Sequence, residues 1–401
     1  MRRDLLLQCR VDLERSILLI ATGLGRGGAE TQLVRLACHL KARGWRVDVV
    51  TMLDRRSFDE ELRQAGIPLH CLAMRRGFPD PRGFFKLLWL MRRRAPSVVV
   101  TFMLHANIMG RIVARLAGVP VVVTSIRNER FGGAGADAME RWLSAISDKV
   151  TTNSELAARA LIERGVVPKE RLQVVPNGLD LSPFATEDLR VRAMKREELN
   201  IEEDQFLWLA VGNLRRQKNY ENLLRAAASL IDSDEHSFQI CVAGLGPCWD
   251  ELHQLRDQLK LNGVVHFLDR RGDVPDLLQA ADGFVLSSSW EGLPNSVMEA
   301  MASRRPVVAT DVGGVSELVE HEETGLLVES NNPDGLAAAL GQVMAMPSQA
   351  RQAMGERGHA SVAARFQVEE VVSQWEGLFD ALAQDKGIAL SLPAHELGAA
   401  E

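Results

Sequence analysis

The sequence predicts an α/β protein made of two doubly wound, parallel-sheet domains. The chain has 401 residues, which at about 100–200 residues per domain indicates two or more domains. Short apolar runs rich in Val, Ile and Leu alternate with amphipathic, helix-like stretches, as in parallel sheets covered on both faces. This alternation begins again after Phe184, so we expect the second domain to repeat the architecture of the first.

The composition excludes several other classes of protein. With 46% hydrophobic and 25% charged residues, the chain is neither collagen-like nor largely disordered. No apolar run reaches the roughly 18 residues of a membrane span. The apolar stretch at 17–21 is short and leads into a glycine loop, so we expect no signal peptide. The five cysteines lack CxxC spacing, and we expect inert thiols in a reducing cytoplasm: Cys9, Cys38, Cys71, Cys241 and Cys248.

In the first half, buried strands are expected between helices. Residues 16–22 form the first strand, and a glycine turn and a helix over 30–43 follow it. Further strands are expected at 45–52, 98–103, 121–125 and 172–175.

In the second half, five more strand candidates are each followed by a helix-like segment or loop. They lie at 206–212, 236–243, 264–268, 283–287 and 306–310. The Asn177–Asp180 turn marks the join. We therefore place the domains at 1–184 and 185–366, a helix within 367–386, and a frayed tail at 387–401.

The charge of the chain is unevenly divided. Residues 1–184 hold 29 Lys and Arg against 18 Asp and Glu, whereas residues 185–401 hold 18 against 35. A basic half joined to an acidic half suggests domains with different partners, and two ordinary solvated surfaces would give the same counts.

A glycine-rich segment, Gly23-Leu-Gly-Arg-Gly27-Gly28, lies between the first strand and its helix. Glycines let the backbone bend sharply and approach a phosphate, which the helix N-terminus attracts. The pattern fits a dinucleotide or phosphate loop, and it fits equally a tight turn that binds nothing, because no acidic residue is well placed about 20 residues further on.

A second segment, Gly212 to Asn219, follows the first strand of the second half and carries the cations Arg215, Arg216 and Lys218. Cations at the carboxyl end of such a strand can clamp a diphosphate, although an isolated cluster is also common in solvated loops.

A third segment, Glu291 to Glu299, follows the strand at 283–287. Pro294 suits the first turn of a helix, whose amides near Asn295 and Ser296 would point at an anion. Glu291 and Glu299 flank this turn and could hold sugar hydroxyls, or act as charges that cap the helix.

Together these segments resemble the signature of family 4 glycosyltransferases, which are retaining enzymes of the GT-B fold. Glu291 and Glu299 have the E-x7-E spacing of that family, within a run that continues through Pro306 and Gly313-Gly314 to Gly325. The resemblance covers nearly the whole chain. It also includes the segments Gly25 to Glu30, Val175 to Gly178, Gly244 to Pro247 and Arg271 to Val274.

The resemblance implies a role for each matching residue. Lys218 would stabilise the departing diphosphate, Glu299 would bind the ribose, and Glu291 would hold the donor sugar. The resemblance also implies contacts of Arg271 with the base, and of Gly27 and Gly28 with donor phosphate and acceptor. Other substrate-binding positions expected in these motifs are Gly212, Asn213, Gly244, Asp273, Leu293, Asn295, Ser296 and Asn107.

The chain departs from the family pattern at two points. Asn213 stands where the family usually has Arg, so Arg216 is expected to supply the second phosphate cation. The frequent active-site His of the family would fall near Arg127, while His105 resembles another family site. Whether Arg127 or His105 faces the reacting sugar stays open.

The resemblance implies transfer of a sugar with retention from a nucleotide-diphosphate donor, with a leaning to UDP, to a hydroxyl of a glycan or lipid-linked acceptor. No metal or cofactor and no nucleic acid is expected. The helix near 368–383 would cross back to the first domain. The alternatives are a GT-B nucleotide-sugar epimerase, a Rossmann oxidoreductase that uses the glycine loop, and a binding module without catalysis.

The segment 75–94 suggests a membrane partner for this cytoplasmic protein. Its aromatic residues Phe78, Phe84, Phe85 and Trp89 lie among seven cations and a single acid, Asp80. Such a segment favours peripheral binding to an anionic leaflet on the inner face of the membrane. An ordinary helix that packs on the sheet and carries Arg on its solvent face would have the same residue pattern. The cations are Arg75, Arg76, Arg82, Lys86, Arg92, Arg93 and Arg94.

Overall fold

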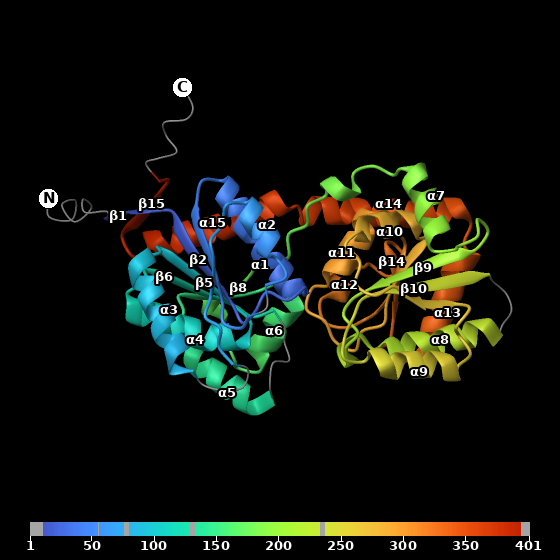
Figure 1. Ribbon diagram of the computed structural model, residues 1–401, viewed down its shortest axis with the longest axis horizontal. Helices are drawn as coiled ribbons and strands as arrows, with labels where there is room; N and C mark the ends of the chain where they lie inside the picture. Colours follow the sequence, from blue (N-terminus) through green and yellow to red (C-terminus); the bar gives the residue numbers. More distant parts are fainter. Residues whose placement is uncertain (1–10, 55, 76–79, 128–132, 233–236, 394–401) are drawn as a thin grey trace, which may run out of the picture. The chain divides into compact units, whose positions relative to one another are not determined.

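The computed structural model describes residues 11–54, 56–75, 80–127, 133–232 and 237–393, and it divides into two compact units (Figure 1). Unit 1 comprises Met1–Gly178 together with Val368–Glu401, and unit 2 comprises Leu179–Gln367. Both units are α/β with parallel sheets, which confirms the fold class expected from the sequence.

Unit 1 is built on a seven-stranded parallel sheet in the order β4-β3-β2-β5-β6-β7-β8. Its central strands are short and β-branched, and every residue in them is buried, which explains their continuous apolar runs. The order reverses direction between β2 and β5, which makes the carboxyl ends of these strands a topological switch point. The strands are β2 (Ser16–Ala21), β3 (Arg46–Thr51), β4 (Leu69–Cys71), β5 (Val98–Phe102), β6 (Val121–Ser125), β7 (Lys149–Thr152) and β8 (Leu172–Val174).

Helices cover both faces of this sheet. One core joins the sheet to α1 and α15, and another joins its opposite face to α3 and α4. The helices of unit 1 are α1 (Gly28–Ala42), α2 (Asp59–Gln64), α3 (Pro81–Arg94), α4 (Leu104–Ala117), α5 (Gly133–Ser144), α6 (Glu155–Glu163) and α15 (Val368–Gln384), with a 3-10 turn η2 (Lys169–Arg171).

The C-terminal segment differs from the frayed tail expected over 387–401. Strand β15 (Ile388–Ser391) pairs in parallel with β1 (Val11–Glu14), and it follows α15, whose apolar face is buried in unit 1. The alternation of Ile388 and Leu390, which pack against the α1/α15 core, explains why this small-residue stretch is ordered. Residues 394–401 lie outside the described part of the chain.

Unit 2 has a six-stranded parallel sheet in the order β11-β10-β9-β12-β13-β14, with its switch point between β9 and β12. One face packs on α10, α11, α12 and α14, and the other on α8, α9 and α13. The strands are β9 (Phe206–Val211), β10 (Phe238–Ala243), β11 (Val265–Phe267), β12 (Gly283–Leu286), β13 (Val307–Thr310) and β14 (Gly325–Val328).

The helices of unit 2 include four that pack on one face of its sheet and three that pack on the other. They are η3 (Ser182–Phe184), α7 (Leu189–Glu198), η4 (Arg216–Lys218), α8 (Tyr220–Asp232), α9 (Trp249–Gln258), α10 (Val274–Ala280), α11 (Asn295–Ala302), α12 (Val315–Leu318), α13 (Pro333–Ala345) and α14 (Ser348–Arg365).

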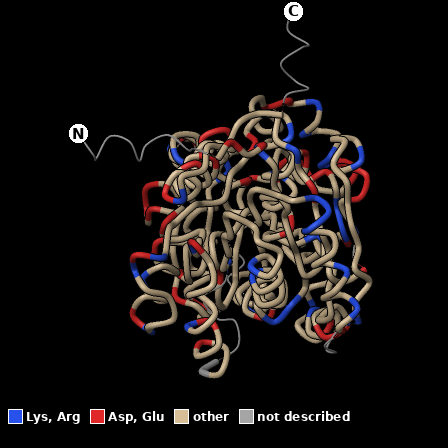
Figure 2. The backbone as a smooth tube through the Cα atoms, turned by 90° about the vertical axis from the view of Figure 1, so that its left-hand side faces the viewer, with Lys and Arg blue, Asp and Glu red and all other residues tan. Residues whose placement is uncertain are grey.

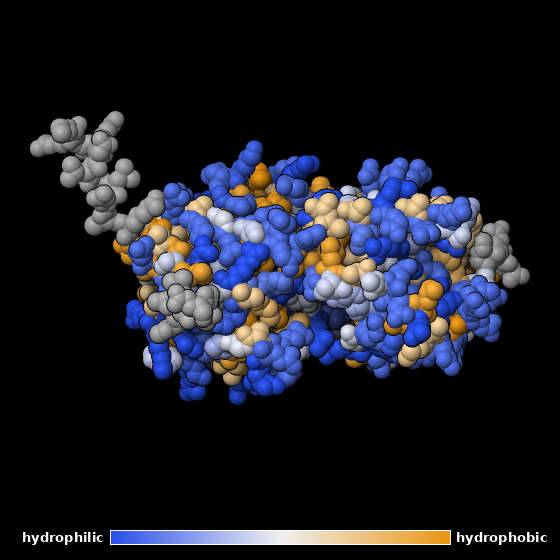
Figure 3. All heavy atoms as spheres, turned by 90° about the horizontal axis from the view of Figure 1, so that it is seen from above, coloured by the Kyte–Doolittle hydropathy of each residue, from blue (hydrophilic) through white to orange (hydrophobic). Residues whose placement is uncertain are grey.

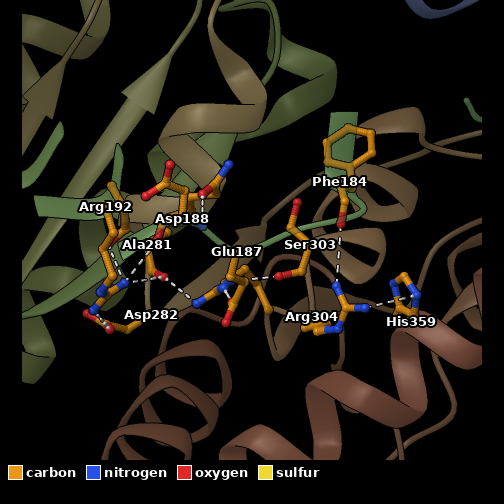
Figure 4. A network of polar contacts seen from close by, with 12 residues as sticks. Phe184, Glu187, Asp188, Arg192, Ala281, Asp282, Ser303, Arg304 and His359 are labelled. Atoms are coloured by element: carbon orange, nitrogen blue, oxygen red, sulfur yellow. Dashed lines mark hydrogen bonds and ion pairs between the residues drawn. The ribbon is translucent and has the colours of Figure 1, made fainter. Parts of the chain in front are cut away.

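A polar network holds the first segment of unit 2 on its body (Figure 4). Arg192 of α7 donates to the backbone carbonyl of Ala281 at 3.1 Å and to Asp282 Oδ1 at 2.5 Å. Arg304 donates to the Phe184 carbonyl at 3.4 Å and lies beside His359. The residues after Leu179 therefore belong structurally to unit 2, so the division at 178/179 lies six residues before the expected boundary.

Among the described helices, none is both long and apolar enough to span a bilayer. The face shown in Figure 3 is largely hydrophilic, with apolar atoms in small patches.

Candidate functional site

The loops at the switch point of unit 2 join a lysine to a buried glutamate. Lys218 ends η4 after β9, and Glu291 lies in the loop after β12. Lys218 Nζ lies 2.6 Å from Glu291 Oε1, and their side chains are only 17% and 8% exposed. Ligands of open α/β sheets bind at this edge, so the pair stands where a ligand is expected.

The carboxylate of Glu291 has further donors. The hydroxyl of Ser288, which is fully buried, donates to the same Oε1 atom at 2.6 Å. Gln217 Nε2 lies 3.5 Å from Oε2 and donates to the Trp290 carbonyl at 3.0 Å. Glu291 is thus held from two loops, as a buried charge requires.

Backbone contacts hold these two loops together. The Ser289 N–H donates to the Gln217 carbonyl at 2.8 Å, and Ser287 Oγ donates to the Lys218 carbonyl at 3.0 Å. Gly313 has φ +52°, and a Cβ there would lie 2.0 Å from the Glu291 carbonyl oxygen, so only glycine fits this contact.

Gly212 and Gly244 let the next pair of loops approach closely. A Cβ on Gly244 would lie 2.0 Å from the Gly212 carbonyl oxygen. That oxygen accepts a hydrogen bond from the Tyr220 hydroxyl at 3.1 Å. Burial, and then the charge of Glu291, raise the pKa of Tyr220 well above its ordinary value, so the hydroxyl stays a donor.

Helix α11 begins at Asn295, directly after Pro294, as the sequence predicts. Leu293 is buried beneath this turn, and Ser296 and Glu299 are half-buried on the helix. Glu291 lies before the helix and Glu299 in its second turn, so the two carboxylates occupy different elements.

Arg216 and Arg271, the two other cations predicted to bind the donor, have carboxylate partners of their own. The Arg216 side chain is 86% exposed, with Glu251 4.0 Å away, whereas Arg271 donates to Asp273 and Glu198 at 2.6 Å each. Hydrogen bonds, foremost from Arg271, hold the pKa of Asp273 well below its usual range. Arg271 is thus engaged by two carboxylates, and a contact with a base would have to share or replace them.

The glycine loop of unit 1 lies at the carboxyl end of β2, at the switch point. Gly27 is the N-cap of α1 and Gly28 its first residue, and no side chain caps the helix at Gly27. A Cβ on Gly27 would lie 2.6 Å from Glu30 Oε2, so the Glu30 carboxylate folds over the loop. In unit 2, Asn213, which stands where the family usually has Arg, lies in the loop after β9.

The turn after β5 contains a strained residue. Met103 has φ 72° and ψ 152°, a region that is nearly restricted to glycine. His105 follows in the first turn of α4 and is exposed, three residues beyond the end of β5.

Asn107 and Arg127 lie near this turn. Asn107 is buried, its Nδ2 donates to the Ser125 carbonyl at 3.0 Å, and its Oδ1 has no partner among the described residues. Arg127 donates to Asn177 Oδ1 and lies over the Phe102 ring, with 5.7 Å from its Cζ to the ring centroid. Burial lowers the pKa of Arg127 to about 10.

The structure thus brings together Lys218, Glu291, Gly212 and Gly244 in unit 2, and the glycine loop with the β5–α4 turn in unit 1. Sequence reasoning missed Ser288, Gln217 and Tyr220. Ser288 is the middle residue of a run of three serines, and only the strand geometry selects the one that faces Glu291.

Comparisons with known proteins identify the family of the chain. Residues 27–178 match the family model "Glycosyl transferase 4-like domain", and residues 191–361 match "Glycosyl transferases group 1". An Escherichia coli UDP-Gal:alpha-D-GlcNAc-diphosphoundecaprenol alpha-1,3-galactosyltransferase is 29% identical over 71% of this chain and 76% of its own. The lipopolysaccharide core biosynthesis glycosyltransferase LpsE of Rhizobium meliloti is 26% identical over 87% and 90%.

Solved structures show the same fold. Anabaena HepE, in complex with UDP and glucose, has a TM-score of 0.81 and 24% identity, and the match covers 90% of this chain and 98% of HepE. The sucrose-phosphate synthase of Thermosynechococcus elongatus has a TM-score of 0.81 and 21% identity, covering 93% and 100%. With both family models matched in chain order, the chain belongs to the group 1 glycosyltransferases of GT-B fold, the family 4-like enzymes that the sequence motifs resemble.

Proposed function

We propose that this glycosyltransferase moves a sugar, with retention of anomeric configuration and without a metal, from a UDP-sugar to a hydroxyl of a lipid-linked or cell-surface glycan intermediate. The observation that carries the donor assignment is the Lys218–Glu291 pair at the switch point of unit 2. It supplies a cation for a diphosphate and a carboxylate for sugar hydroxyls at the edge where such folds bind ligands.

In this proposal, Lys218 faces the diphosphate and the amide groups at the start of α11 add positive potential. Negative charge grows on the diphosphate as the sugar leaves, so positive groups fixed in advance lower the barrier. Glu291 holds the sugar hydroxyls and Glu299 the ribose, in keeping with the family motif. Arg216 is exposed, so it would reach the phosphates only by moving its side chain.

The acceptor belongs to unit 1 in this proposal, with His105, Asn107, Arg127 and the glycine loop as its contact residues. The printed names of the two bacterial relatives, one acting on a diphosphoundecaprenol-linked sugar and one in lipopolysaccharide core synthesis, support a lipid-linked or lipopolysaccharide acceptor.

The surface of α3 supports peripheral binding of the protein to the anionic inner face of the cell membrane. Phe85 and Trp89 are 65% and 59% exposed, Arg93 lies over the Trp89 ring, and α3 has no acidic residue. Figure 2 marks the cations along the chain. Phe84 instead packs against the α3/α4 core, and Arg94 pairs with Asp48 at 3.1 Å. Arg76 and Phe78 lie outside the described residues.

A flotation experiment tests this surface. Each cation near an anionic leaflet contributes about 1 kcal/mol, so the wild type should float with phosphatidylglycerol vesicles at low salt and be released at high salt. The double variant Phe85→Ser/Trp89→Ser should lose the binding, while Leu189→Ser, at an exposed leucine of unit 2, should keep it. Equal flotation of both variants would contradict the assignment.

The activity itself is tested with a panel of UDP-sugars and polyprenyl-diphosphate sugar acceptors, with NMR of the product linkage. We expect an axial, retained linkage, and turnover that survives EDTA. Donor conversion without an acceptor would indicate the epimerase, and an inverted product or loss of turnover in EDTA would contradict the corresponding part of the proposal.

A further inference from the structure

In the proposed donor site of unit 2, a negative charge of the protein itself lies against the cation. Glu291 Oε1 lies 2.6 Å from Lys218 Nζ, and both side chains are largely buried. A buried cation and a buried anion each require a partner, and in this pair each side chain provides the partner of the other. A diphosphate that approaches Lys218 therefore meets a cation that already has a counter-ion.

Glu291 does not depend on Lys218 alone. Ser288 Oγ donates to the same Oε1 atom at 2.6 Å, and Ser288 is fully buried. The Ser288 carbonyl accepts from Thr310 Oγ1 at 2.6 Å, so neighbouring strand ends fix its backbone. The carboxylate would keep this donor, and the more distant Gln217, after losing the lysine.

We propose that Glu291 is the resident counter-ion of Lys218, that the donor diphosphate replaces it, and that Ser288 is the positioning residue that then keeps the carboxylate in place for the sugar. This inference rests on the proposed function, because it takes the diphosphate to bind at Lys218. The exchange couples the two halves of the donor: the diphosphate releases Glu291 Oε1, and the sugar hydroxyls give it a new partner.

The exchange makes a prediction that a simple sugar-binding role for Glu291 does not make. In Glu291→Gln the amide keeps nearly the same shape but no longer competes for Lys218 with a full charge. UDP alone should therefore bind more tightly than to the wild type, by about threefold to tenfold, because a close like charge is removed from the anion. Uridine, which carries no phosphate, should bind equally to both proteins.

Isothermal titration with UDP and uridine measures this change. Glu323→Gln is the matched control: it removes one exposed negative charge of unit 2 that pairs with Arg357 at 3.2 Å, and neither residue belongs to the proposed site. We expect no more than a twofold change in UDP affinity for this control. In the double variant Lys218→Ala/Glu291→Gln the gain in affinity should disappear, since no cation remains to be released.

Ser288→Ala tests the positioning role. UDP affinity should stay within twofold of the wild type, while turnover at saturating UDP-sugar should fall about tenfold to a hundredfold, as expected for the loss of a hydrogen bond to a charged group. Ser288→Thr, which retains the hydroxyl, should restore part of the turnover. Ser289→Ala, whose hydroxyl lies 3.4 Å from Asn331 Oδ1, should behave as the wild type.

The outcomes separate this inference from the proposed function. If UDP does not bind the wild type, the donor assignment fails. If UDP binds but Glu291→Gln binds it equally or more weakly, the exchange is wrong while the glycosyltransferase proposal stands. If Glu291→Gln binds UDP more tightly but Ser288→Ala keeps normal turnover, only the positioning role of Ser288 is overturned.

Discussion

The switch points of the two units handle charge in opposite ways. In unit 2 Lys218 has a buried carboxylate partner at 2.6 Å. In unit 1 Arg127 donates to Asn177 and stacks on Phe102, and no carboxylate among the described residues forms an ion pair with it. Charges out of contact with water are normally paired, so Lys218 of unit 2 is neutralised by a carboxylate of the protein, whereas the described residues supply no carboxylate to Arg127. An anion that binds Lys218 has to displace Glu291, whereas an anion that binds Arg127 displaces no described carboxylate.

The backbone differs as well. In unit 2 glycines allow the loops to approach, as at Gly313 and Gly244, without strain on a side chain. In unit 1 the turn before His105 places a methionine, Met103, in a conformation that favours glycine. Strain of this kind persists only where the surrounding structure enforces it, and here α4 packs against β5 and β6.

The largest effect is expected when the paired and unpaired arginines of unit 1 are compared. Arg111 and Glu140 form a fully buried pair at 2.7 Å, so Arg111→Met leaves Glu140 uncompensated and should cost about 3–5 kcal/mol of unfolding free energy. Arg127→Met should change the free energy of unfolding by less than about 1 kcal/mol or increase it, because it removes a half-buried charge that has no acidic partner among the described residues. Urea unfolding of both variants measures the difference, and an equal loss in both would mean that Arg127 is paired in solution.

The next largest effect is expected on turnover, when Lys218 of unit 2 is removed. Lys218→Ala should lower turnover about 100- to 1000-fold, as the loss of a comparable preorganised donor does elsewhere. Because Lys218 is buried against Glu291, this variant should also lose stability, which a solvated loop lysine would not. Lys218→Arg should recover part of the activity, since it keeps the charge and changes the geometry. Near-normal turnover of Lys218→Ala at saturating donor would overturn the assignment.

Glu299→Gln should have a smaller effect, confined to the nucleotide. If Glu299 accepts the ribose hydroxyls, the variant should weaken both uridine and UDP by about tenfold, the usual size for a hydrogen bond to a charged group. Glu291→Gln is expected to act in the opposite direction on UDP, so titrations of the two variants side by side sharpen the distinction. A normal affinity of Glu299→Gln for uridine would remove Glu299 from the ribose.

The smallest effect concerns pH and the C-terminal segment of unit 1. Burial alone would raise the pKa of Asp148, but hydrogen bonds from Arg115, Lys386 and the Val122 N–H hold it below the ordinary value. The carboxyl thus binds its proton less readily when folded, so its contribution to stability is present above the ordinary aspartate pKa of about 4 and is lost as pH falls through the folded pKa. Asp148→Asn should flatten the acid side of the melting-temperature profile. An unchanged profile would contradict this.

The fold, and the placement of glycines and cations at the ends of strands, could be predicted because both depend on patterns along the chain. Buried strands such as 98–102 and 121–125 are continuous apolar runs, and glycines and cations follow strand ends. Pairings across loops could not be predicted in this way. The positions of these residues along the chain do not show that Lys218 contacts Glu291, 73 residues later. They also do not show that Arg271 donates to Glu198, 73 residues earlier. Five strands were not predicted from the sequence. Strand β14 lies at the end of the family motif, and β1, β4, β7 and β15 are short and only partly buried or lack a long apolar run.

Because α15 and β15 complete the core of unit 1, that unit is assembled from the two ends of the chain. During synthesis, residues up to Gly178 emerge first but lack Trp375 and Phe379, which fill their core. At about 5–20 residues per second, the ribosome needs roughly 10–40 s to make the intervening unit before this helix follows. The unit synthesised second can therefore finish folding first, and a chain truncated before Val368 would expose the apolar face of α1 while leaving unit 2 whole.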